Sequence, residues 1–533
     1  MSPKLLVLLA AAFISKTAKA TNLNVYDPVP GLDPSPYYDI RVREKGKDHW
    51  IKTFPMITEC TDAKHCTSHK VIADHLKNWS NTYINIEMRE GVDIEFKITM
   101  LFGNETISKA VVHPNAAAQD CNWEDGNAYV TINKPGLFAV DINGQMDDQD
   151  TGKIPKTRKQ YYDGPPLHTV TIFANPFIED KPSLEDEGVY KVIPGQVPPG
   201  QGEWHTLYFL SGQHDLGISF PIHCNKSYYI PGDAVVYATL NNKKDKKDGH
   251  HIHIYGHGTL SGEKYPHPED ENPPLDEDQY WTYSPIRIDG AYNVRIEGIT
   301  VINSAYHSVQ TDARYDPSNP TDIKWIKVFT WRPNGDGIGL HANGLVEDCF
   351  VRTQDDSFYV TGRAMRRNVI WNDSNGSAWV FNHIGQPAMN THDVEIEDCN
   401  VIYSRAHWNN GPGASVFNMR SQGQGEGGYT VYFRNIKVED PRPTNQQFKI
   451  FMESLEPYGP YGKRGPGDLH GIIFENITIV APSVLDEPDI LWGSEDAMIY
   501  GLQFYNVKIG NNRVEGIEYF LHNEYVFDNK PFK

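Results

Sequence analysis

The 533-residue sequence has few cysteines, a single long apolar run and no excess of basic side chains. Outside the first 20 residues no apolar run is long enough to span a bilayer, which argues against an integral membrane protein with spanning helices. The 49 Lys and Arg side chains are outnumbered by 69 Asp and Glu, giving a formal net charge of −20. Because phosphate neutralisation needs a basic face, we expect no nucleic-acid partner.

The one apolar run lies in residues 1–20 and has the pattern of a secretory signal peptide. Lys4 supplies the positive start, LLVLLAAAFI the apolar stretch, and AKA at 18–20 the small-residue cleavage site. We therefore expect a secreted, extracellular protein, monomeric and with no membrane partner. Acceptors for N-glycosylation fit this expectation and occur at Asn78, Asn104, Asn225, Asn372, Asn375 and Asn476.

The six cysteines, although few, are an even number that suits an oxidising compartment. Cys60 and Cys66 are close enough in sequence to close a small disulfide loop. The pairing of Cys121, Cys224, Cys349 and Cys399 cannot be read from the sequence. Buried free thiols inside a stack of repeats are an equal alternative for them.

Residues 21–205 contain short β-like runs separated by Gly, Pro and Asn clusters at hairpin-like spacing. Such a pattern predicts an N-terminal β-sandwich. The runs are TYINIEM, VDIEFKITM, NAYVTI, GLFAVDI and HTVTIFA. The polar, Pro- and Gly-rich segment 179–204 is typical of a linker or an exposed loop.

After residue 205 a short unit recurs, in which an apolar residue and a polar or small pair precede alternating β-branched or aromatic positions. Taking Ile299 as the reference position, the equivalents are Ile326, Cys349, Val369, Cys399, Ile436, Ile477 and Val507. A fixed core with variable loops and no helical period predicts a solenoid whose coils are strands. The spacing is too irregular for a propeller and too short for βαβ units with full helices. We therefore predict an all-β protein in which the sandwich is followed by a right-handed parallel β-helix over 206–515 and a tail over 516–533.

Three aspartates leave two successive units of this predicted solenoid. Asp336 lies ten residues after Ile326, and Asp355 and Asp356 lie six and seven residues after Cys349. Neighbouring coils are separated by the strand spacing of about 4.8 Å, so we expect the three carboxylates to gather on one face. Clustered carboxylates raise at least one pKa, which supplies the protonated acid and the ionised base that glycosidic bond cleavage needs. The alternatives are a solvated turn or a Ca²⁺ loop, and the latter needs six or more oxygen ligands.

Aromatic residues near the aspartates are candidates for stacking on sugar rings, although strand aromatics are most often core residues. The candidates for substrate binding are Trp331, Tyr359 and Trp379. His383, one unit further along, is expected either to bind a sugar hydroxyl or to be a structural histidine. The segment HHIHIYGHG (250–258) fits an opening coil better than a zinc site, and we expect no metal and no cofactor.

Several stretches resemble family 49 glycoside hydrolases, the dextranases and isopullulanases. They are INKPGLFAVDING (132–144), HTLYFLSGQHDLG (205–217), NGDG (334–337) and VRTQDDSFYVTGRAMRRNVIWND (351–373). The resemblance implies a β-sandwich on a β-helix and endo-acting, inverting hydrolysis of an α-glucan. By position it implies Asp355 as the general acid and Asp336 and Asp356 as the pair that activates water.

The sequence departs from the family after the aspartate pair, where SFYV (357–360) replaces a stretch that usually holds a lysine. The linkage that is cleaved therefore stays open. Three alternatives remain: a polygalacturonase-like pectin hydrolase, a polysaccharide lyase, and an inactive carbohydrate-binding protein on the same scaffold. The pectin alternative depends on arginines to hold uronate, and the candidates are Arg314, Arg332, Arg352, Arg363 and Arg405.

Overall fold

The computed structural model describes residues 21–59, 79–146, 168–200, 202–242, 249–271, 273, 275–313, 320–332, 334–339, 344–373, 376–380, 393–404, 415–420, 430–443, 445–451, 468–484, 487–495 and 497–529. The expected signal peptide, Cys60 and Cys66 lie outside these ranges. Among the described residues, no helix combines the length and the apolar character that a bilayer crossing requires.

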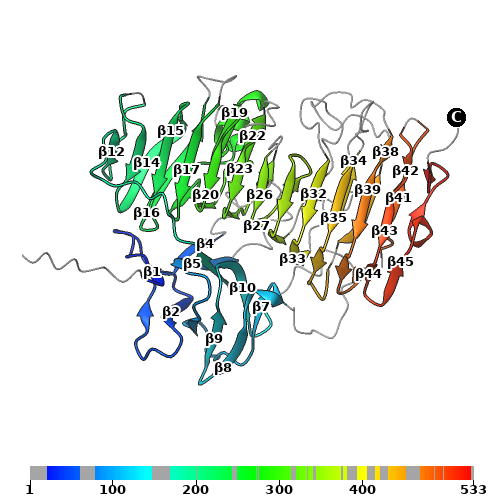
Figure 1. Ribbon diagram of the computed structural model, residues 1–533, viewed down its shortest axis with the longest axis horizontal. Coiled ribbons are helices and arrows are strands. Elements are labelled where there is room, and N and C mark those ends of the chain that lie inside the picture. Colours follow the sequence, from blue (N-terminus) through cyan, green and yellow to red (C-terminus); the bar gives the residue numbers. More distant parts are fainter. Residues whose placement is uncertain are drawn as a thin grey trace, which may run out of the picture.

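The predicted β-sandwich is present at the N-terminus and consists of two sheets that enclose an apolar core (Figure 1). In one sheet the order is β1 (Leu23–Val25), β5 (Ser80–Met88), β11 (His168–Asn175), β10 (Gly136–Ile142) and β7 (Ala110–His113), with β4 (Met56–Glu59) also paired to β5. In the other the order is β3 (Ile51–Lys52), β2 (Tyr38–Glu44), β6 (Ile94–Met100), β9 (Asn127–Ile132) and β8 (Asp120–Glu124). The five β-like runs of the sequence coincide with β5, β6, β9, β10 and β11.

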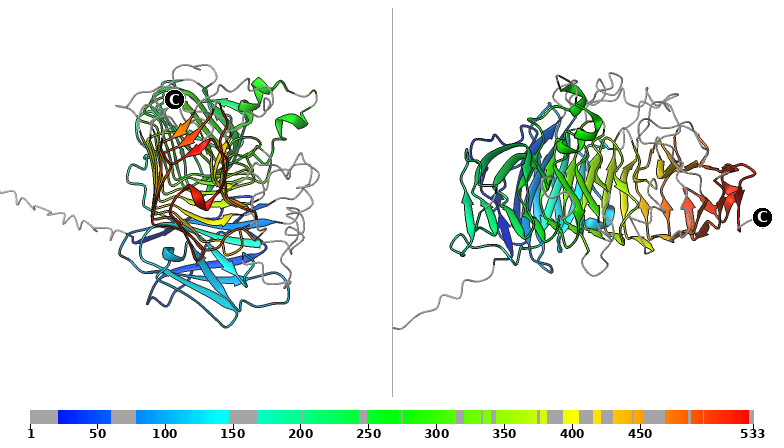
Figure 2. Two further views of the ribbon diagram at one scale, coloured as in Figure 1. Left: turned by 90° about the vertical axis from the view of Figure 1, so that its right-hand side faces the viewer. Right: turned by 90° about the horizontal axis from the view of Figure 1, so that it is seen from above.

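The predicted right-handed parallel β-helix is confirmed and lies along the sandwich (Figures 1 and 2). Each coil contributes one strand to each of three parallel ladders, which we call the front, base and top ladders.

The front ladder is a sheet of β12 (Val189–Val192), β13 (Thr206–Phe209), β15 (Lys226–Ile230), β17 (Ile252–Gly256), β20 (Arg295–Glu297), β23 (Asp322–Lys324), β26 (Leu345–Glu347), β29 (Ala364–Arg366), β32 (Val394–Glu397), β35 (Val431–Arg434), β39 (Ile472–Glu475) and β43 (Gln503–Tyr505).

The base and top ladders both continue from β14 (Gly212–Pro221) and β16 (Ala234–Asn241). The base ladder consists of β18 (Thr259–Ser261), β21 (Thr300–Ile302), β24 (Lys327–Phe329), β27 (Phe350–Thr353), β30 (Val369–Asn372), β33 (Asn400–Ser404), β36 (Lys437–Val438), β40 (Thr478–Ile479) and β44 (Val507–Ile509), with β45 (Asn512–Val514) antiparallel to β44. The top ladder consists of β19 (Ile286–Ala291), β22 (Val309–Ala313), β25 (Ile338–Gly339), β28 (Phe358–Tyr359), β31 (Trp379–Val380), β34 (Ser415–Arg420), β37 (Gln446–Phe451), β41 (Ile490–Trp492) and β46 (Leu521–His522).

A small parallel sheet of β38 (Leu469–His470), β42 (Ile499–Tyr500) and β47 (Val526–Phe527) covers the C-terminal coils. The remaining regular elements of the described ranges are the 3-10 helices η1 (Asn115–Ala117), η3 (Pro268–Asp270), η4 (Glu277–Tyr283) and η6 (Ile517–Tyr519).

A sharp turn joins the front strand of each coil to its base strand. In successive coils one residue of this turn has a positive φ: Gly298, Trp325, Asp348, Arg367, Asp398, Asn435, Asn476 and Asn506. The residue after it points into the solenoid and is buried, as Ile299, Ile326 and Cys349 are. Stacking these residues coil on coil buries a core that no single coil has.

The predicted core position Val369 is wrong by one residue. Phe350 pairs with Val369, so the residue equivalent to Cys349 is Asn368. Asn368 is buried and satisfies its amide inside the core: Cys349 N–H donates to its Oδ1 (3.0 Å), and its Nδ2 donates to the Val346 carbonyl (3.0 Å). Val369 points outward into the apolar cluster shared with the sandwich.

The predicted domain limits are corrected at both ends. β12, inside the expected linker 179–204, pairs in parallel with β13, so the solenoid begins at Val189 and not at residue 206. Trp204 of the same segment belongs to the core of the solenoid. At the other end β46 and β47 pair with strands of the last coils, so the solenoid extends beyond residue 515.

The described cysteines are free thiols. Cys349 and Cys399 are buried in the stacked core, whereas Cys121 and Cys224 are partly buried. The alternative of free thiols inside a repeat stack therefore holds for Cys349 and Cys399.

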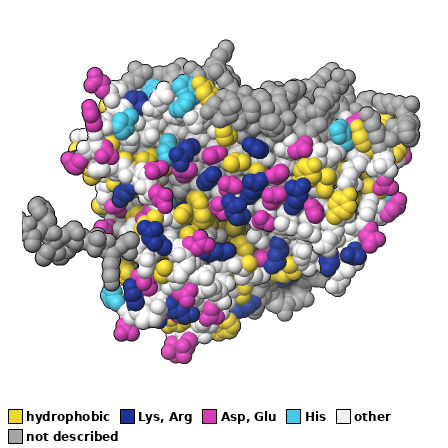
Figure 3. Space-filling model, viewed as in Figure 1, with side chains coloured by type: hydrophobic (Ala, Val, Ile, Leu, Met, Phe, Trp, Pro, Cys, Tyr) yellow, Lys and Arg dark blue, Asp and Glu magenta, His cyan; other side chains and the backbone are white. Residues whose placement is uncertain are grey.

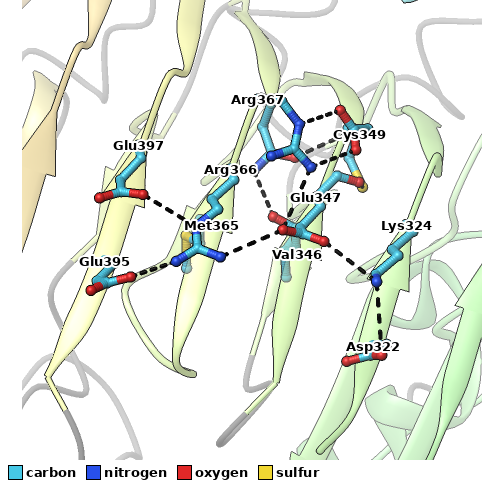
Figure 4. Close-up of polar contacts among 12 residues, drawn as sticks. Asp322, Lys324, Val346, Glu347, Cys349, Met365, Arg366, Arg367, Glu395 and Glu397 are labelled. Atoms are coloured by element: carbon cyan, nitrogen blue, oxygen red, sulfur yellow. Dashed lines mark hydrogen bonds and ion pairs between the residues drawn. The ribbon is translucent and has the colours of Figure 1, made fainter. Parts of the chain in front are cut away.

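Charged side chains of alternating sign cover the outward side of the front ladder (Figures 3 and 4). Strand register places Lys324, Glu347, Arg366, Glu397 and Arg434 in one row across five coils. Ion pairs connect the row from coil to coil, with N–O distances of 3.4, 3.8, 3.2 and 3.0 Å. A pairing shifted by one coil would place like charges together, so the row favours the native register.

Replacing Asn368 by Ala should destabilise the fold by roughly 1–3 kcal/mol, because a buried N–H and a buried carbonyl lose their partner. Chemical denaturation of the variant beside Ile326→Val, at the equivalent position of a neighbouring coil, measures this. The control should cost about 0.5–1.5 kcal/mol. A smaller loss for Asn368→Ala than for the control would contradict the structural role of the amide.

Candidate active site

The candidate site lies in the connections between base and top strands of three successive coils. Val309 pairs with Ile338, and Ile338 pairs with Phe358. Two residues before each of these positions stand His307, Asp336 and Asp356, so these three residues form one row across the coils. The backbone continues the pairing along the row, since Ser308 N donates to Asp336 O (2.8 Å) and Gly337 N donates to Asp356 O (2.8 Å).

Asp355 is fixed beside this row by its own backbone surroundings. Its Oδ2 accepts from Asn334 N (3.0 Å), and its Oδ1 accepts from Asp356 N (2.9 Å). Gly376 of the next coil packs on the peptide between the two aspartates, where a Cβ would lie 2.2 Å from Asp356 N. Only glycine allows the coils to approach so closely here. Asp355 keeps partial exposure, whereas Asp336 and Asp356 are buried.

Tyr359 reaches into the site from the top strand β28. Its hydroxyl donates to Asp336 Oδ2. The ring lies over Gly339 of the preceding coil, where a Cβ would lie 2.8 Å from Tyr359 Cδ2 and 2.8 Å from Gln310 Nε2. The glycine therefore provides the space through which the phenol reaches the carboxylate. This contact comes from the SFYV stretch, at which the sequence departs from the family pattern.

The carboxylates of the cluster affect one another. Burial, and then the negative charges of Asp355 and Asp356, raise the pKa of Asp336 well above its usual range, while the hydrogen bond from Tyr359 acts in the opposite direction. Burial and the nearby carboxylates raise the pKa of Tyr359 well above its usual range, so the phenol stays protonated and donates. The cluster as a whole therefore binds a proton more tightly than isolated aspartates do, so it can hold a protonated and an ionised carboxyl group side by side, which is the condition for acid and base catalysis at one pH.

His307 is a member of the row that the sequence did not indicate. Its Nε2 lies 3.5 Å from Asp336 Oδ1. Burial, and then the positive charges of Arg287 and His267, lower the pKa of His307 to about 3. The imidazole is therefore neutral near pH 7 and supplies a polar contact, not a charge. The available sequence signal was a histidine in the loop of the coil before Asp336. It could be recognised only once the strand register was known.

Aromatic rings continue from His307 toward the surface. Tyr306 stacks on His307 with centroids 4.1 Å apart, and Tyr280 of η4 meets Tyr306 edge to face at 5.8 Å. Tyr280 is partly exposed. Tyr306 is buried in an apolar cluster, so of the two tyrosines it is Tyr280 that has the exposure needed to stack on a sugar ring.

A buried ion pair supports the aspartate loop from below. Arg352 and Asp373 are fully buried and joined at 2.8 Å (Nε–Oδ2), and Gln354 Nε2 donates to Asp373 (3.0 Å). The Arg352 guanidinium also stacks on Trp371 (4.1 Å) and donates to Thr169 of the sandwich (2.7 Å). Removing either charge would leave the other buried without its partner, at a cost of about 3–5 kcal/mol.

Two of the predicted substrate-binding residues are not at the surface. Trp331 is 2% exposed, its Nε1 donates to Thr58 of the sandwich (2.8 Å), and it therefore joins the two domains. Trp379 is 1% exposed and stacks on Phe417 inside the solenoid (5.3 Å), because register makes it equivalent to the inward-pointing Phe358. Both predictions are wrong. Tyr359 lies in the site, and His383 lies outside the described residues.

The arginines proposed for uronate binding are constrained in the same way. Arg352 is buried in an ion pair with Asp373, and Arg332 is buried and donates to the Tyr265 carbonyl (2.6 Å). Arg363 is exposed. Arg314 and Arg405 lie outside the described residues.

The glycosylation prediction fails at one described position. Asn372 is fully buried and its Nδ2 donates to Asp355 O (3.1 Å), so it cannot carry a glycan in the folded protein. Asn104, Asn225 and Asn476 are exposed, which leaves the prediction open for them. Asn78 and Asn375 lie outside the described residues.

No known family model matches the sequence, and no curated protein matches it. Among solved structures the chain is similar to Dex49A from Penicillium minioluteum, with a TM-score of 0.67, 16% identity, and coverage of 93% of this chain and 92% of that chain. A family 28 exopolygalacturonase from Yersinia enterocolitica (TM-score 0.35, 14% identity, 82% and 96% covered) and the catalytic unit of a GH87 alpha-1,3-glucanase from Streptomyces thermodiastaticus (TM-score 0.34, 11% identity, 96% and 87% covered) are less similar. The expected resemblance to family 49 is thus confirmed at the level of the fold.

Replacing Asp336 by Asn should stabilise the protein increasingly as the pH rises. The folded-state pKa of Asp336 is raised, so the folded protein binds its proton more tightly than the unfolded chain, and stability is lost as the pH rises from about 4 toward the folded pKa. The variant does not titrate and avoids this loss, which amounts to about 1.4 kcal/mol per pKa unit.

Unfolding free energies measured between pH 4 and pH 8 would reveal this trend. Asp348→Asn is the matched control, because its carboxylate is paired with Arg367 (2.8 Å) and its loss should not stabilise. If the Asp336→Asn variant gains no unfolding free energy over the parent protein at high pH, the pKa of Asp336 is not raised by its surroundings.

Proposed function

We propose that the protein is a secreted, endo-acting glycoside hydrolase that cleaves an α-glucan with inversion. The observation that carries this proposal is the row of Asp336 and Asp356 on adjacent coils with Asp355 beside it. Because burial and mutual repulsion make this coupled cluster hold a proton, its three carboxyl groups can supply both an acid and a base for a glycosidic bond. Support for the substrate class and the inverting outcome comes from the sequence resemblance to family 49 and from the likeness in fold to Dex49A.

Asp355 is the proposed general acid, as the resemblance implies. It is partly exposed, so its carboxyl group can meet the oxygen of a sugar linkage, whereas Asp336 and Asp356 are buried. In the proposed step Asp355 protonates the leaving oxygen while water attacks the anomeric carbon and gives its proton to the Asp336–Asp356 pair. Tyr359 and His307 hold Asp336 in place through its two oxygens.

A neutral glucan is favoured over a uronate polymer. Of the described arginines that were candidates for uronate, Arg332 and Arg352 are engaged within the fold.

Asp355→Asn should lower kcat by about 10²–10⁴-fold, which is the contribution expected of a positioned general acid, and should leave the fold intact. The assay measures reducing ends released from dextran, pullulan, starch and polygalacturonate, with chromatography of products and NMR of the first-formed anomer. Asp348→Asn, in the turn at the other end of β27, is the control and should retain activity.

A near-normal rate for Asp355→Asn would remove this residue from the acid role. Release of reducing ends from none of the four polymers, together with retained binding, would favour an inactive binding protein. Products that absorb in the ultraviolet would indicate a lyase.

Tyr359→Phe should shift the acid limb of the kcat/KM profile to higher pH. The hydrogen bond from the phenol stabilises the ionised form of Asp336 and so lowers its pKa. Without it the pKa rises, and the Asp336–Asp356 pair loses its proton at a higher pH. pH profiles of the variant and of the parent enzyme on the best polymer measure the shift. An unchanged acid limb would mean that Asp336 does not need to lose its proton for turnover.

A further inference from the structure

A cavity of about 310 Å³ lies away from the aspartates, where the segment after β11 of the sandwich meets the front ladder. Pro176–Asp180 form one wall, and side chains of β17, β20 and β23 form the other. Strand β24 separates the two sites: Trp325, which lines the cavity, precedes it, and the loop of Asp336 follows it. The volume is at the lower end of the range for small-molecule sites.

Trp325 has an unusual backbone conformation for its residue type. Its φ is +57°, in the left-handed region that costs an L-residue roughly 1–2 kcal/mol and is rare for bulky side chains. The same turn position holds Gly, Asp, Asn or Arg in the other coils. One part of the indole packs on the apolar cluster between the domains, and the residue also lines the cavity while remaining partly exposed. A strained, partly exposed tryptophan at a cavity indicates a ligand-binding role.

Further rings line the cavity on both walls. Tyr255 is buried in a cluster with Tyr208 and Tyr229 and stacks on His253 with centroids 3.9 Å apart, so it gives the cavity a rigid wall. Phe177 on the opposite wall is held by the Arg89 guanidinium, 4.9 Å above its ring. Rigid aromatic faces beside a few polar groups are what a flat, hydroxylated ligand such as a sugar requires.

The charges on the strand wall of the cavity are already paired, and the opposite wall carries the exposed carboxylates of Glu179 and Asp180, so the cavity disfavours an anionic ligand. Glu297 contacts Arg295 (3.0 Å) and His253 (3.0 Å). Lys324 contacts Glu347 (3.4 Å) and Asp322 (3.9 Å) (Figure 4). An anionic ligand would have to break these pairs and would meet Glu297, whereas a neutral ligand can exchange hydrogen bonds with them.

We propose that this cavity is a second carbohydrate-binding site, which holds a neutral oligosaccharide segment of the polymer on Trp325 and Phe177. The ligand class rests on the proposed function. The site retains the chain on the enzyme between cleavages at the separate aspartate cluster.

Trp325→Asn tests the proposal with little risk to the fold, because Asn occupies the same left-handed position in three later coils. The variant is made in the Asp355→Asn background and run on native gels containing dextran, pullulan or polygalacturonate. We expect at least threefold weaker retardation by the neutral polymer that binds best, and the same for Phe177→Ala. Tyr505→Ala, which removes an exposed ring (55%) from the same ladder, is the control and should bind like its parent. Melting temperatures check that each variant is folded.

Equal retardation of Trp325→Asn, Phe177→Ala and their parent overturns the site, as does failure of the parent to bind any neutral polymer. A loss confined to polygalacturonate overturns the neutral class. Failure of the proposed function is distinguishable, because it leaves polymers uncut by the unsubstituted enzyme while binding still depends on Trp325.

Discussion

Hydrogen bonding between successive coils in fixed register is the constraint on which the rest of the structure depends. It converts separations of about 20–40 residues along the chain into neighbouring positions about 4.8 Å apart. The inward row of apolar residues, the turn residues with positive φ and the charged row on the front ladder all repeat this register. The carboxylates gather for the same reason that the core does. A slip by one residue would turn every side chain of a strand to the other face and would separate Asp336 from Asp356.

The sandwich adds a second constraint, because it contacts the coils that carry the site. Thr58, Thr169 and Asn175 accept hydrogen bonds from Trp331, Arg352 and Lys327, respectively. Lys327 is fully buried at this junction, and burial lowers its pKa well below the usual range. Such polar contacts are specific in geometry and weak in net energy, so their main effect is to fix how the two domains meet.

Much of this could be predicted from the sequence. The alternation of β-branched residues and the recurrence of a short unit predicted both domains, and the spacing of Asp336, Asp355 and Asp356 predicted their meeting. The failures share one cause: an alternating pattern leaves an uncertainty of one residue, and only the partner strand removes it. Asn368 was passed over because a polar residue is not expected in a core, although its amide is satisfied there. Trp331 and Trp379 are large and follow strands, but the sequence does not say which face they occupy. His307 became visible only with the register.

The contacts between the described residues of the sandwich and of the solenoid reach as far as Glu439, whose carboxylate lies 3.5 Å from His113 and accepts from Asn115 N (2.9 Å). In the part of the chain that the structure describes, the later coils pair with their neighbours and with the small sheet of β38, β42 and β47. In a one-dimensional stack, loss of order starts at the free end and advances coil by coil. Thermal fraying of this molecule that begins at the C-terminal coils would therefore reach the coils of the aspartates only after all the coils that follow them, so that the candidate site is separated from the least stable part of the stack.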